Sequence, residues 1–441
     1  MAPEAYDTIY SIATGMGRAA VAIVRVSGPS CQTILKKICP TVFFLDRRAT
    51  FARIGELSGE LIDLGIVIFF YGPRSFTGED VIEFHVTGSR AVLTALLKTL
   101  SLFPATRPAD AGEFARRSFA NGKRDLAEIE GLASVVEADT IVQLRHAQRS
   151  ASGELSRECE GIREKLVGCM ALLESLLDFS DIEDPEARSV IDVMTAISEM
   201  RERIRALLLG SSHSERLRDG LVIVIAGPPN AGKSSLINYL TKREVSIVSS
   251  NPGTTRDLIE VLVDIAGFPI VLVDTAGIRE SSDPVEAEGI VRARKRSDSA
   301  DLTLWLTSCM DVDSVDQTQK CTVLKIKTKC DLAPDVHFSD EYIKVSTITG
   351  VGISTLVERI AGIAHSRLGG AANSLITTQR QRAAILEAND ALARFMGDPA
   401  APIEVMAEEL RFAARCMSRV VGRIDVEEVL TGVFSRLCVG K

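Results

Sequence analysis

The chain has 441 residues, of which 46% are hydrophobic and 25% charged, and its formal net charge is −8. This balance is typical of a folded globular protein and excludes an intrinsically disordered chain. The length exceeds what one hydrophobic core supports and predicts about three domains. The negative net charge argues against a nucleic-acid coat protein, although one domain can still carry a local basic face for RNA.

Nine cysteines are present, and none has the paired C-x-x-C spacing of a zinc or redox site. We therefore expect most of them to be buried and reduced in a cytoplasmic protein. Asp7 stands where a signal peptide requires a basic start and an apolar core, and the longest apolar run, Ile66 to Tyr71, is too short to span a bilayer. The sequence predicts neither export nor a membrane span.

The first part of the chain, up to about residue 118, alternates β-rich runs with turn residues. The run Ala19 to Val26 is followed by Ser-Gly-Pro, and the run Leu64 to Tyr71 by Gly-Pro, as is typical of strands that end in turns. Residues 89–102 have helical spacing. These patterns predict an α+β domain.

Three charged residues of this region are candidates for a polar pocket. Arg25 lies on a predicted strand, Glu83 at the end of another, and Lys123 in the sequence Asn-Gly-Lys-Arg-Asp. From composition alone, the simpler interpretation is that all three are solvated surface charges.

Between Asp125 and about Arg218 the pattern becomes helical and contains almost no proline. Apolar residues recur at every third or fourth position, which predicts a long bundle helix with a narrow buried stripe. The stripe consists of Leu155, Cys159, Ile162, Leu166, Cys169, Leu173 and Leu176. The same periodicity resumes from Val193 to Leu209, so this region is expected to be scaffold.

A glycine-rich loop follows the next apolar run. Leu221 to Ala226 is succeeded by Gly227-Pro-Pro-Asn-Ala-Gly-Lys-Ser234 and then by a segment with helical spacing. A strand, a glycine-rich loop and a helix in this order can wrap a phosphate chain with backbone N–H groups. Lys233 would then reach the β- and γ-phosphates, and the Ser234 hydroxyl would bind Mg²⁺. Taken alone, the loop could also be an ordinary strand-to-helix turn.

Later loops in the same region make that alternative a poor one. Residues 249–257 are rich in glycine and hydroxyl groups, and an apolar run delivers Asp274-Thr-Ala-Gly277. A carboxylate at the end of a strand can hold the water shell of Mg²⁺, and the N–H of Gly277 can meet a γ-phosphate. The carboxylate of Asp331, in the sequence Thr-Lys-Cys-Asp, would accept hydrogen bonds from guanine. The sequence Ser346-Thr-Ile would lie on the other side of the base. Alternating strands and helices here predict a mostly parallel sheet.

From about Thr377 the chain is helical again and ends in Cys438-Val-Gly-Lys441. A thiol in such a tail would be accessible and reactive. Cys438 could equally be a spare cysteine.

These motifs together resemble the MnmE (TrmE) family of tRNA-modification GTPases over the whole chain. The resemblance is carried by the phosphate loop, Gly253-Thr-Thr-Arg-Asp257, Asp274-Thr-Ala-Gly277, the terminal Cys-Val-Gly-Lys, Gly17-Arg18, Arg25-Val-Ser-Gly-Pro29, Ser75-Phe-Thr-Gly-Glu-Asp80, Gly112-Glu-Phe114 and Asn121-Gly-Lys123. The family usually ends in Cys-Ile-Gly-Lys.

The resemblance implies a multidomain fold: an α+β N-terminal folate-binding domain, an all-α helical domain in two segments and an inserted α/β P-loop GTPase domain. The expected boundaries are 1–118 for the N-terminal folate-binding and dimerisation domain, 119–218 and 375–441 for the two helical segments, and 219–374 for the GTPase domain.

The resemblance also implies a cytoplasmic homodimer that binds a tetrahydrofolate derivative, 5,10-methylene- or 5-formyl-, as one-carbon donor. With an FAD-dependent partner, MnmG (GidA), it would add a carboxymethylaminomethyl-type group at C5 of the wobble uridine, position 34, of certain tRNAs.

Site residues follow from the same resemblance by position. Folate would contact Arg25, Glu83, Lys123 and Lys441, and Cys438 matches a cysteine proposed to be catalytic. GTP would contact Asn230, Ala231, Gly232, Lys233, Ser234, Ser235, Ser249, Ser250, Asn251, Pro252, Gly253, Thr254, Thr255, Asp274, Thr275, Ala276, Gly277, Thr328, Lys329, Cys330, Asp331, Ser346, Thr347 and Ile348. Ser234 and Thr255 would ligate Mg²⁺.

The catalytic glutamine that Ras-like enzymes carry after Asp-x-x-Gly is absent, because Ile278 follows Gly277. In the family a potassium ion replaces the arginine finger, and its oxygen ligands would come from Asn230, Ser249, Asn251 and Thr254. Glu286 matches the catalytic glutamate that positions water. Its alternative role is that of a solvated carboxylate at a helix start.

Some positions depart from the family pattern. The base motif reads Thr-Lys-Cys-Asp instead of Asn-Lys-x-Asp, so Thr328 offers one hydroxyl in place of an amide and one base contact is expected to weaken by roughly 1 kcal/mol. Residues 307–321 form a shorter segment than the family norm, and Ser346-Thr-Ile replaces Ser-Ala-Lys or similar.

A second class of function fits the GTPase motifs alone, namely a GTP-switched RNA- or ribosome-binding module of Era type. Such a switch needs neither the N-terminal domain nor the Cys438 tail. We therefore favour the tRNA-modifying GTPase.

Overall fold

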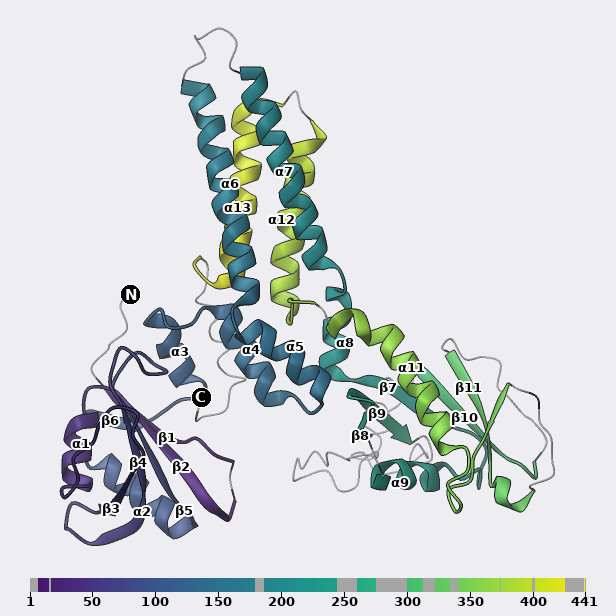
Figure 1. The fold of residues 1–441 in the computed structure, drawn as a ribbon, viewed down its shortest axis with the longest axis horizontal. Helices are drawn as coiled ribbons and strands as arrows, with labels where there is room; N and C mark the ends of the chain where they lie inside the picture. Colours follow the sequence, from purple (N-terminus) through teal and green to yellow (C-terminus); the bar gives the residue numbers. More distant parts are fainter. Residues whose placement is uncertain are drawn as a thin grey trace, which may run out of the picture. The chain divides into compact units, whose positions relative to one another are not determined.

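The computed structural model describes residues 7–15, 17–178, 186–243, 260–274, 300–311, 322–333, 339, 341–372, 374–398, 401–424 and 440 (Figure 1). Contacts divide the chain into two compact units. The first unit is Met1–Ala133, Ser156–Ser180 and Ala401–Lys441, and the second is Ser134–Leu155 and Asp181–Ala400. These units do not test the boundaries at residues 118, 218 and 374, which stay predictions.

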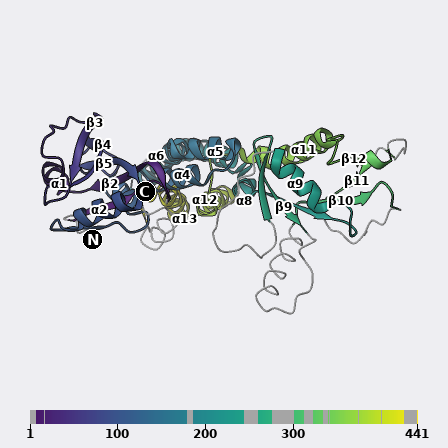
Figure 2. The same ribbon diagram turned by 90° about the horizontal axis from the view of Figure 1, so that it is seen from below.

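The first unit contains a six-stranded sheet in the order β3-β4-β5-β2-β1-β6. Its strands are β1 (Thr8–Ile12), β2 (Ala19–Ser27), β3 (Thr50–Gly55), β4 (Leu61–Phe70), β5 (Val81–Gly88) and β6 (Thr106–Pro108). All neighbours are antiparallel except β1 and β6, which are parallel. The helices α1 (Cys31–Ile38) and α2 (Arg90–Ser101) lie beside the strands of this sheet (Figure 2). Their apolar residues, such as Ile34 and Leu96, share one buried core with Val24 and Phe84 of the strands. Alternate strand residues are buried because successive side chains point to opposite faces.

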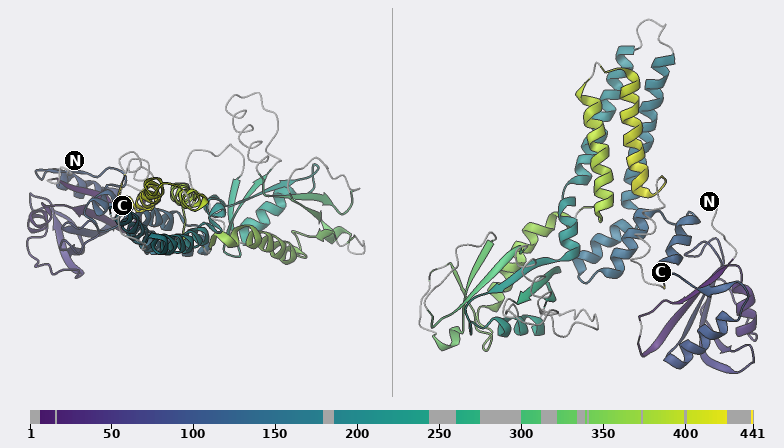
Figure 3. Two further views of the ribbon diagram at one scale, coloured as in Figure 1. Left: turned by 90° about the horizontal axis from the view of Figure 1, so that it is seen from above. Right: turned by 180° about the vertical axis from the view of Figure 1, so that it is seen from behind.

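Two short helices follow in the first unit, α3 (Glu113–Ala120) and the start of α4 (Leu126–Glu137). The long helices α6 (Glu154–Asp178) and α13 (Ile403–Val421) lie side by side (Figure 1 and Figure 3). Arg411 pairs with Glu174 and Arg423 with Glu160, each at 3.2 Å. Arg411 precedes Arg423 along the chain, whereas its partner Glu174 follows Glu160. The two helices therefore run antiparallel.

The predicted buried stripe of α6 is confirmed from Leu155 to Leu173, and the burial of Leu176 lies outside what the structure describes. The members of the stripe from Leu155 to Leu173 are at most 5% exposed. In the second unit, α7 (Glu186–Leu208) packs along α12 (Gln379–Gly397), so helical segments before and after the GTPase region pair with one another in both units. The expectation of a helical domain made from two segments of the chain is therefore confirmed.

The second unit also contains a six-stranded sheet in the order β12-β11-β10-β7-β9-β8. Its strands are β7 (Leu221–Ala226), β8 (Glu260–Ile265), β9 (Phe268–Asp274), β10 (Leu302–Ser308), β11 (Thr322–Thr328) and β12 (Tyr342–Lys344). Only the β8–β9 pair is antiparallel among these described strands. Every residue of β7 is buried, as in a central strand of a sheet covered on both faces.

Helices α9 (Lys233–Arg243) and α11 (Ile353–Ala372) pack against this sheet through residues such as Leu236, Leu240, Leu356 and Ile360. The helix α5 (Ile141–Ala151), the short helix η1 (Ser211–His213) and α8 (Ser214–Asp219) complete the described helices of this unit, apart from the turn η3 (Cys330–Leu332). The predicted fold class, with an α+β domain, a helical domain and an inserted α/β domain, is confirmed. Within the described ranges, no helix has the length and apolarity that a membrane crossing requires.

Candidate functional site

The phosphate loop lies where the sequence predicts it, between the end of β7 and the first residue of α9. Gly227 adopts φ 144°, and a Cβ atom on it would lie 2.1 Å from the carbonyl oxygen of Leu306, so only glycine permits this approach of the two backbones. Asn230 adopts the left-handed conformation with φ 63°. The loop therefore turns sharply and leads directly into the first residue of α9, and a helix start of this kind can bind a phosphate through backbone N–H groups.

The ammonium group of Lys233 is held inside this loop. It donates hydrogen bonds to the carbonyl oxygens of Gly227 and Pro228, both at 2.9 Å. A phosphate oxygen is a stronger acceptor than a carbonyl because the hydrogen bond is then assisted by both charges. The lysine is thus positioned to exchange these partners for a phosphate.

A pair of oxygen ligands suited to Mg²⁺ stands beside the loop. The Ser234 hydroxyl donates to Oδ2 of Asp274 at 3.2 Å, and Asp274 at the end of β9 is only 6% exposed. Within the described ranges, no cluster of three or more His, Cys, Asp and Glu side chains could hold a metal ion. Mg²⁺ commonly takes only one or two protein oxygens and completes its shell with waters and phosphates, so these two residues fit the ion.

The base loop after β11 is tied directly to the phosphate loop. The Thr328 hydroxyl, 4% exposed, donates to the carbonyl oxygen of Ala231 at 2.7 Å and lies 3.3 Å from that of Thr307. The sequence suggested that this hydroxyl would contact guanine. In the structure this hydroxyl donates to the phosphate loop, a contact across 97 residues that no local pattern could reveal, and its contact with guanine stays a prediction.

The two base motifs are joined as well. Ser346 Oγ donates to Oδ1 of Asp331 at 2.6 Å and accepts from the N–H groups of Ile348 and Thr349 at 3.3 and 3.2 Å. Lys329 has φ 55°, which begins the short turn η3 that carries Asp331. The Asp331 carboxylate is therefore oriented before any base arrives.

Several predicted site residues lie outside the described part of the chain. They are Ser249, Ser250, Asn251, Pro252, Gly253, Thr254, Thr255, Thr275, Ala276, Gly277, Glu286, Cys438 and Lys441. The phosphate loop, Asp274 and both base motifs come together at the carboxyl ends of the parallel strands, where ligands bind in open α/β sheets.

In the first unit, Arg25 and Glu83 form one ion pair across β2 and β5. The Nε and Nη2 atoms of Arg25 lie 3.0 and 2.8 Å from Oε1 of Glu83, and the side chains are 20% and 16% exposed. Nε2 of His85 lies 3.6 Å from Oε2 of Glu83, beyond hydrogen-bond distance. The interpretation as solvated surface charges is therefore wrong for this pair, whereas Lys123 is exposed.

The tail of the chain reaches the same pair. Nη1 of Arg25 donates to the carbonyl oxygen of Gly440 at 3.3 Å. A Cβ atom on Gly440 would lie 2.5 Å from Cα of Ala13, so Gly440 lies against the backbone just after β1. Gly440 is the residue before Lys441, which the sequence assigned to the folate site.

Glu113 of the sequence Gly112-Glu-Phe114 is the buried centre of an ionic network with Arg107 and Arg117. Glu113 in Gly-Glu-Phe is 2% exposed and accepts hydrogen bonds from Arg107 at 2.6 and 2.8 Å, and from Arg117 at 3.2 Å. Burial opposes ionisation, but the Arg107 hydrogen bonds and the N–H of Asp110 outweigh it and lower the pKa of Glu113 to about 2. Sequence reasoning missed this network because its members are charged residues with no periodic signal.

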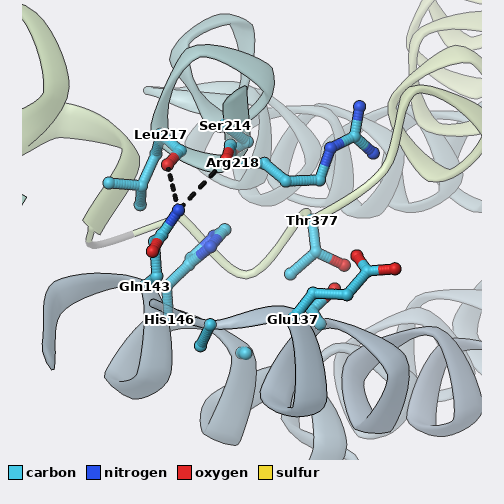
Figure 4. A pocket seen from close by; sticks show the side chains of 10 residues that line it. Glu137, Gln143, His146, Ser214, Leu217, Arg218 and Thr377 are labelled. Carbon is cyan, nitrogen blue, oxygen red and sulfur yellow. Dashed lines mark hydrogen bonds between the residues drawn. The ribbon is translucent and has the colours of Figure 1, made fainter. Parts of the chain in front are cut away.

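A cavity of about 30 Å³ lies elsewhere in the second unit (Figure 4). Gln143 and His146 of α5 face it, and Gln143 donates to the carbonyl oxygens of Leu217 and Arg218 at 3.0 Å each. Nε2 of His146 and Oγ of Ser214 are buried without a hydrogen-bond partner. The volume suffices for a water molecule but not for a nucleotide. We interpret it as a hydration site that joins α5 to α8.

Two family models match the sequence. Residues 8–123 match the family model described as the N-terminus of the GTP-binding protein TrmE, and residues 126–438 match the one described as the MnmE helical domain. A solved structure, the G domain of the FeoB iron transporter of T. maritima, is 25% identical over 33% of this chain and 98% of its own, with a TM-score of 0.26.

Curated relatives match over nearly the full length. A protein of Bradyrhizobium sp. (strain BTAi1) named tRNA modification GTPase MnmE is 43% identical over 99% of both chains. One of Beijerinckia indica with the same name is 44% identical over 99% of this chain and 96% of its own. The chain therefore belongs to the MnmE family of tRNA modification GTPases.

Proposed function

We propose that this chain hydrolyses GTP and couples the hydrolysis to modification of the wobble uridine of tRNA. Membership of the MnmE family makes it a GTP hydrolase. The observation that carries the nucleotide assignment is the 2.7 Å hydrogen bond from Thr328 to Ala231, which joins the base loop to the phosphate loop. A nucleoside triphosphate bound by both loops would be recognised at once by its base and by its phosphates.

Hydrolysis would rest mainly on electrostatic positioning. The N-terminus of α9 and Lys233 would hold the negative β- and γ-phosphates, and Asp331 would accept hydrogen bonds from guanine. Ser234, Asp274 and Thr255 would hold Mg²⁺, which neutralises charge on the phosphates. The N–H of Gly277 would contact the γ-phosphate.

Potassium is the proposed substitute for an arginine finger. Asn230 carries a neutral oxygen on a loop that is already turned by its left-handed backbone. With oxygens of Ser249, Asn251 and Thr254 it would form a cage for a monovalent cation, which supplies positive charge beside the γ-phosphate. Dimerisation of two GTPase domains would order this cage, and Glu286 would position the attacking water.

The tRNA chemistry is assigned to the N-terminal unit. We propose that Arg25, Glu83, Lys123 and Lys441 bind a tetrahydrofolate derivative, with Cys438 close by. The contact between Arg25 and Gly440 supports this, because it brings the end of the tail to a residue of the proposed pocket. A homodimer in the cytoplasm with MnmG as partner, and the domain boundaries given above, complete the proposal.

The test compares the purified chain with the variant Lys233→Ala. GTP hydrolysis should fall by at least about tenfold, because Lys233 is the cation of the phosphate loop. Lys242→Ala, on the exposed side of the same helix, serves as the control and should hydrolyse GTP normally. In cells that lack the chain, wobble-uridine modification of tRNA should be lost and should return with the wild type but not with Lys233→Ala. Normal modification without the chain would contradict the proposal.

A further inference from the structure

Two cysteines meet at the edge of the candidate base site. Cys309 directly follows β10 and Cys330 follows β11 by two residues, and the strands are parallel neighbours with Ser308 opposite Thr328. The N–H of Cys309 donates to the carbonyl oxygen of Thr328 at 2.9 Å. This backbone contact brings Cys309 next to the turn that carries Cys330, so the Cys330 side chain is close enough to act on the Cys309 thiol. Both thiols are free.

The two thiols differ in their access to solvent. Cys309 is 8% exposed, whereas Cys330 is half-buried. Burial first, and then the hydrogen bond and charge of Cys330, raise the pKa of Cys309 to about 12. An external oxidant therefore meets Cys330 first, and Cys309 is placed to react second.

We propose that Cys309 and Cys330 form a reversible disulfide that switches off guanine-nucleotide binding. The inference rests on the proposed function, because it assumes that the loop carrying Asp331 binds guanine. Nothing in the proposed hydrolysis requires either thiol. The pair is thus a redox site added to the nucleotide site.

The oxidant is a low-molecular-weight disulfide such as oxidised glutathione. The Cys330 thiolate attacks one sulfur of that disulfide, which forms a mixed disulfide and releases one thiolate. Cys309 then loses its proton to solvent and attacks the sulfur of Cys330, which forms the protein disulfide and releases the second thiolate. Two protein thiols are oxidised and one external disulfide is reduced to two thiols.

The bond would act on guanine through the turn η3. The Cys330 thiol now donates to the carbonyl oxygen of Lys327 at 3.1 Å, and a disulfide sulfur has no proton to donate. Asp331 is the next residue, and its carboxylate is held by Ser346 at 2.6 Å. Drawing Cys330 towards β10 would turn Asp331 away from this partner.

The experiment incubates the full chain with oxidised glutathione at increasing ratios to reduced glutathione. Peptide mass spectrometry after alkylation of free thiols locates any disulfide, and fluorescence titration with a labelled GDP measures affinity. We expect a Cys309–Cys330 disulfide and a fall in GDP affinity of at least about tenfold, with full recovery after reduction. Oxidation should become faster as the pH rises, since Cys309 must lose its proton.

Matched variants separate the disulfide from other modifications. Cys169→Ser removes another buried thiol, on α6, and should behave as the wild type does. Cys309→Ser, with Cys309→Ala as a second choice if the first does not fold, should keep its GDP affinity under the same oxidation. An equal loss of affinity in the Cys309 variant would assign the effect to Cys330 alone and overturn the proposal.

Two further results would also overturn it. One is the absence of the disulfide from oxidised wild type, which the peptide map detects whether or not the chain binds guanine. The other is a complete disulfide with unchanged GDP affinity. Failure of the reduced chain to bind any guanine nucleotide would instead contradict the proposed function, and the two failures are therefore distinguishable.

Discussion

The guanidinium group of Arg25 donates a hydrogen bond to the carbonyl oxygen of Gly440, 415 residues further along the chain. The same guanidinium pairs with Glu83 and lies 5.6 Å from the ring centre of Phe76. An arginine held by a carboxylate, an aromatic ring and the chain terminus is preorganised, so little entropy is lost when it binds a ligand. This arrangement makes the folate hypothesis directly testable.

Arg25→Ala should weaken binding of 5-formyltetrahydrofolate by roughly 10- to 150-fold, because a charge-assisted hydrogen bond contributes about 1.5 to 3 kcal/mol. Isothermal titration measures the change. Arg53→Ala, which removes an exposed arginine from β3 of the same sheet, is the matched control. Equal affinities of the wild type and Arg25→Ala would leave Arg25 with a structural role only.

Asp331→Asn should shift the preference of the chain from GTP towards xanthosine triphosphate. The carboxylate matches two donors that guanine presents together, whereas the amide offers a donor to the acceptor of xanthine. The ratio of the two affinities should change by at least about tenfold, since two hydrogen bonds are mismatched. An unchanged preference for GTP would mean that this loop does not read the base.

Potassium should raise kcat for GTP hydrolysis well above its value in sodium, because the smaller sodium ion fits the same oxygen cage poorly. Asn230→Ala should abolish that difference and leave nucleotide binding largely intact. Rates in the two salts, measured at equal ionic strength, provide the test. If wild-type rates were identical, the cation would have no part in the mechanism.

In the same assay Glu286→Ala should slow hydrolysis by about 10² to 10⁴ without weakening GTP affinity.

Thr328→Val should lower GDP affinity and the free energy of unfolding, because the buried carbonyl oxygen of Ala231 loses its donor. The cost of such an unsatisfied group is about 1 to 3 kcal/mol. Thr328→Ser keeps the hydroxyl and is the matched control. Titration with GDP measures the affinity, and unfolding by urea measures the free energy of unfolding. A valine variant with the same GDP affinity and the same stability as the serine variant would refute the role of this hydrogen bond.

Acidification below about pH 6.5 should destabilise the second unit through His146. Burial, reinforced by the positive charge of Arg149, lowers the pKa of His146 from its usual 6.5, although hydrogen bonds to the backbone of Ile376 and Ser374 oppose this. The unfolded chain therefore takes up a proton at a higher pH than the folded chain does, and stability present above pH 6.5 is lost as the pH falls through the folded pKa.

His146→Gln removes that proton uptake while it keeps a polar side chain at the cavity. Its urea-unfolding midpoint should fall less steeply than that of the wild type between pH 7 and pH 5.5. Identical slopes would show that another group controls acid stability.

Local patterns were sufficient for most of the fold. The stripe from Leu155 to Leu173 predicted α6, and the run Leu221 to Ala226 predicted β7 residue for residue. Both predictions succeed because helix and strand periodicities are properties of consecutive residues. The loops that carry Lys233 and Asp331 were predicted to lie close together for a different reason, because the carboxyl ends of strands in a parallel sheet meet at one edge.

The sequence by itself thus determined the main elements, their order and the fold class, whereas the roles of the nucleotide-loop residues stay predictions. Only the tertiary structure decided which distant partners each polar group found: the Thr328 hydroxyl donates to Ala231, Arg25 pairs with Glu83, and the N–H of Cys309 donates to the carbonyl oxygen of Thr328. Such contacts join residues on different strands and loops. Their geometry depends on how whole elements pack, because each buried polar group must find a partner that sequence spacing does not specify.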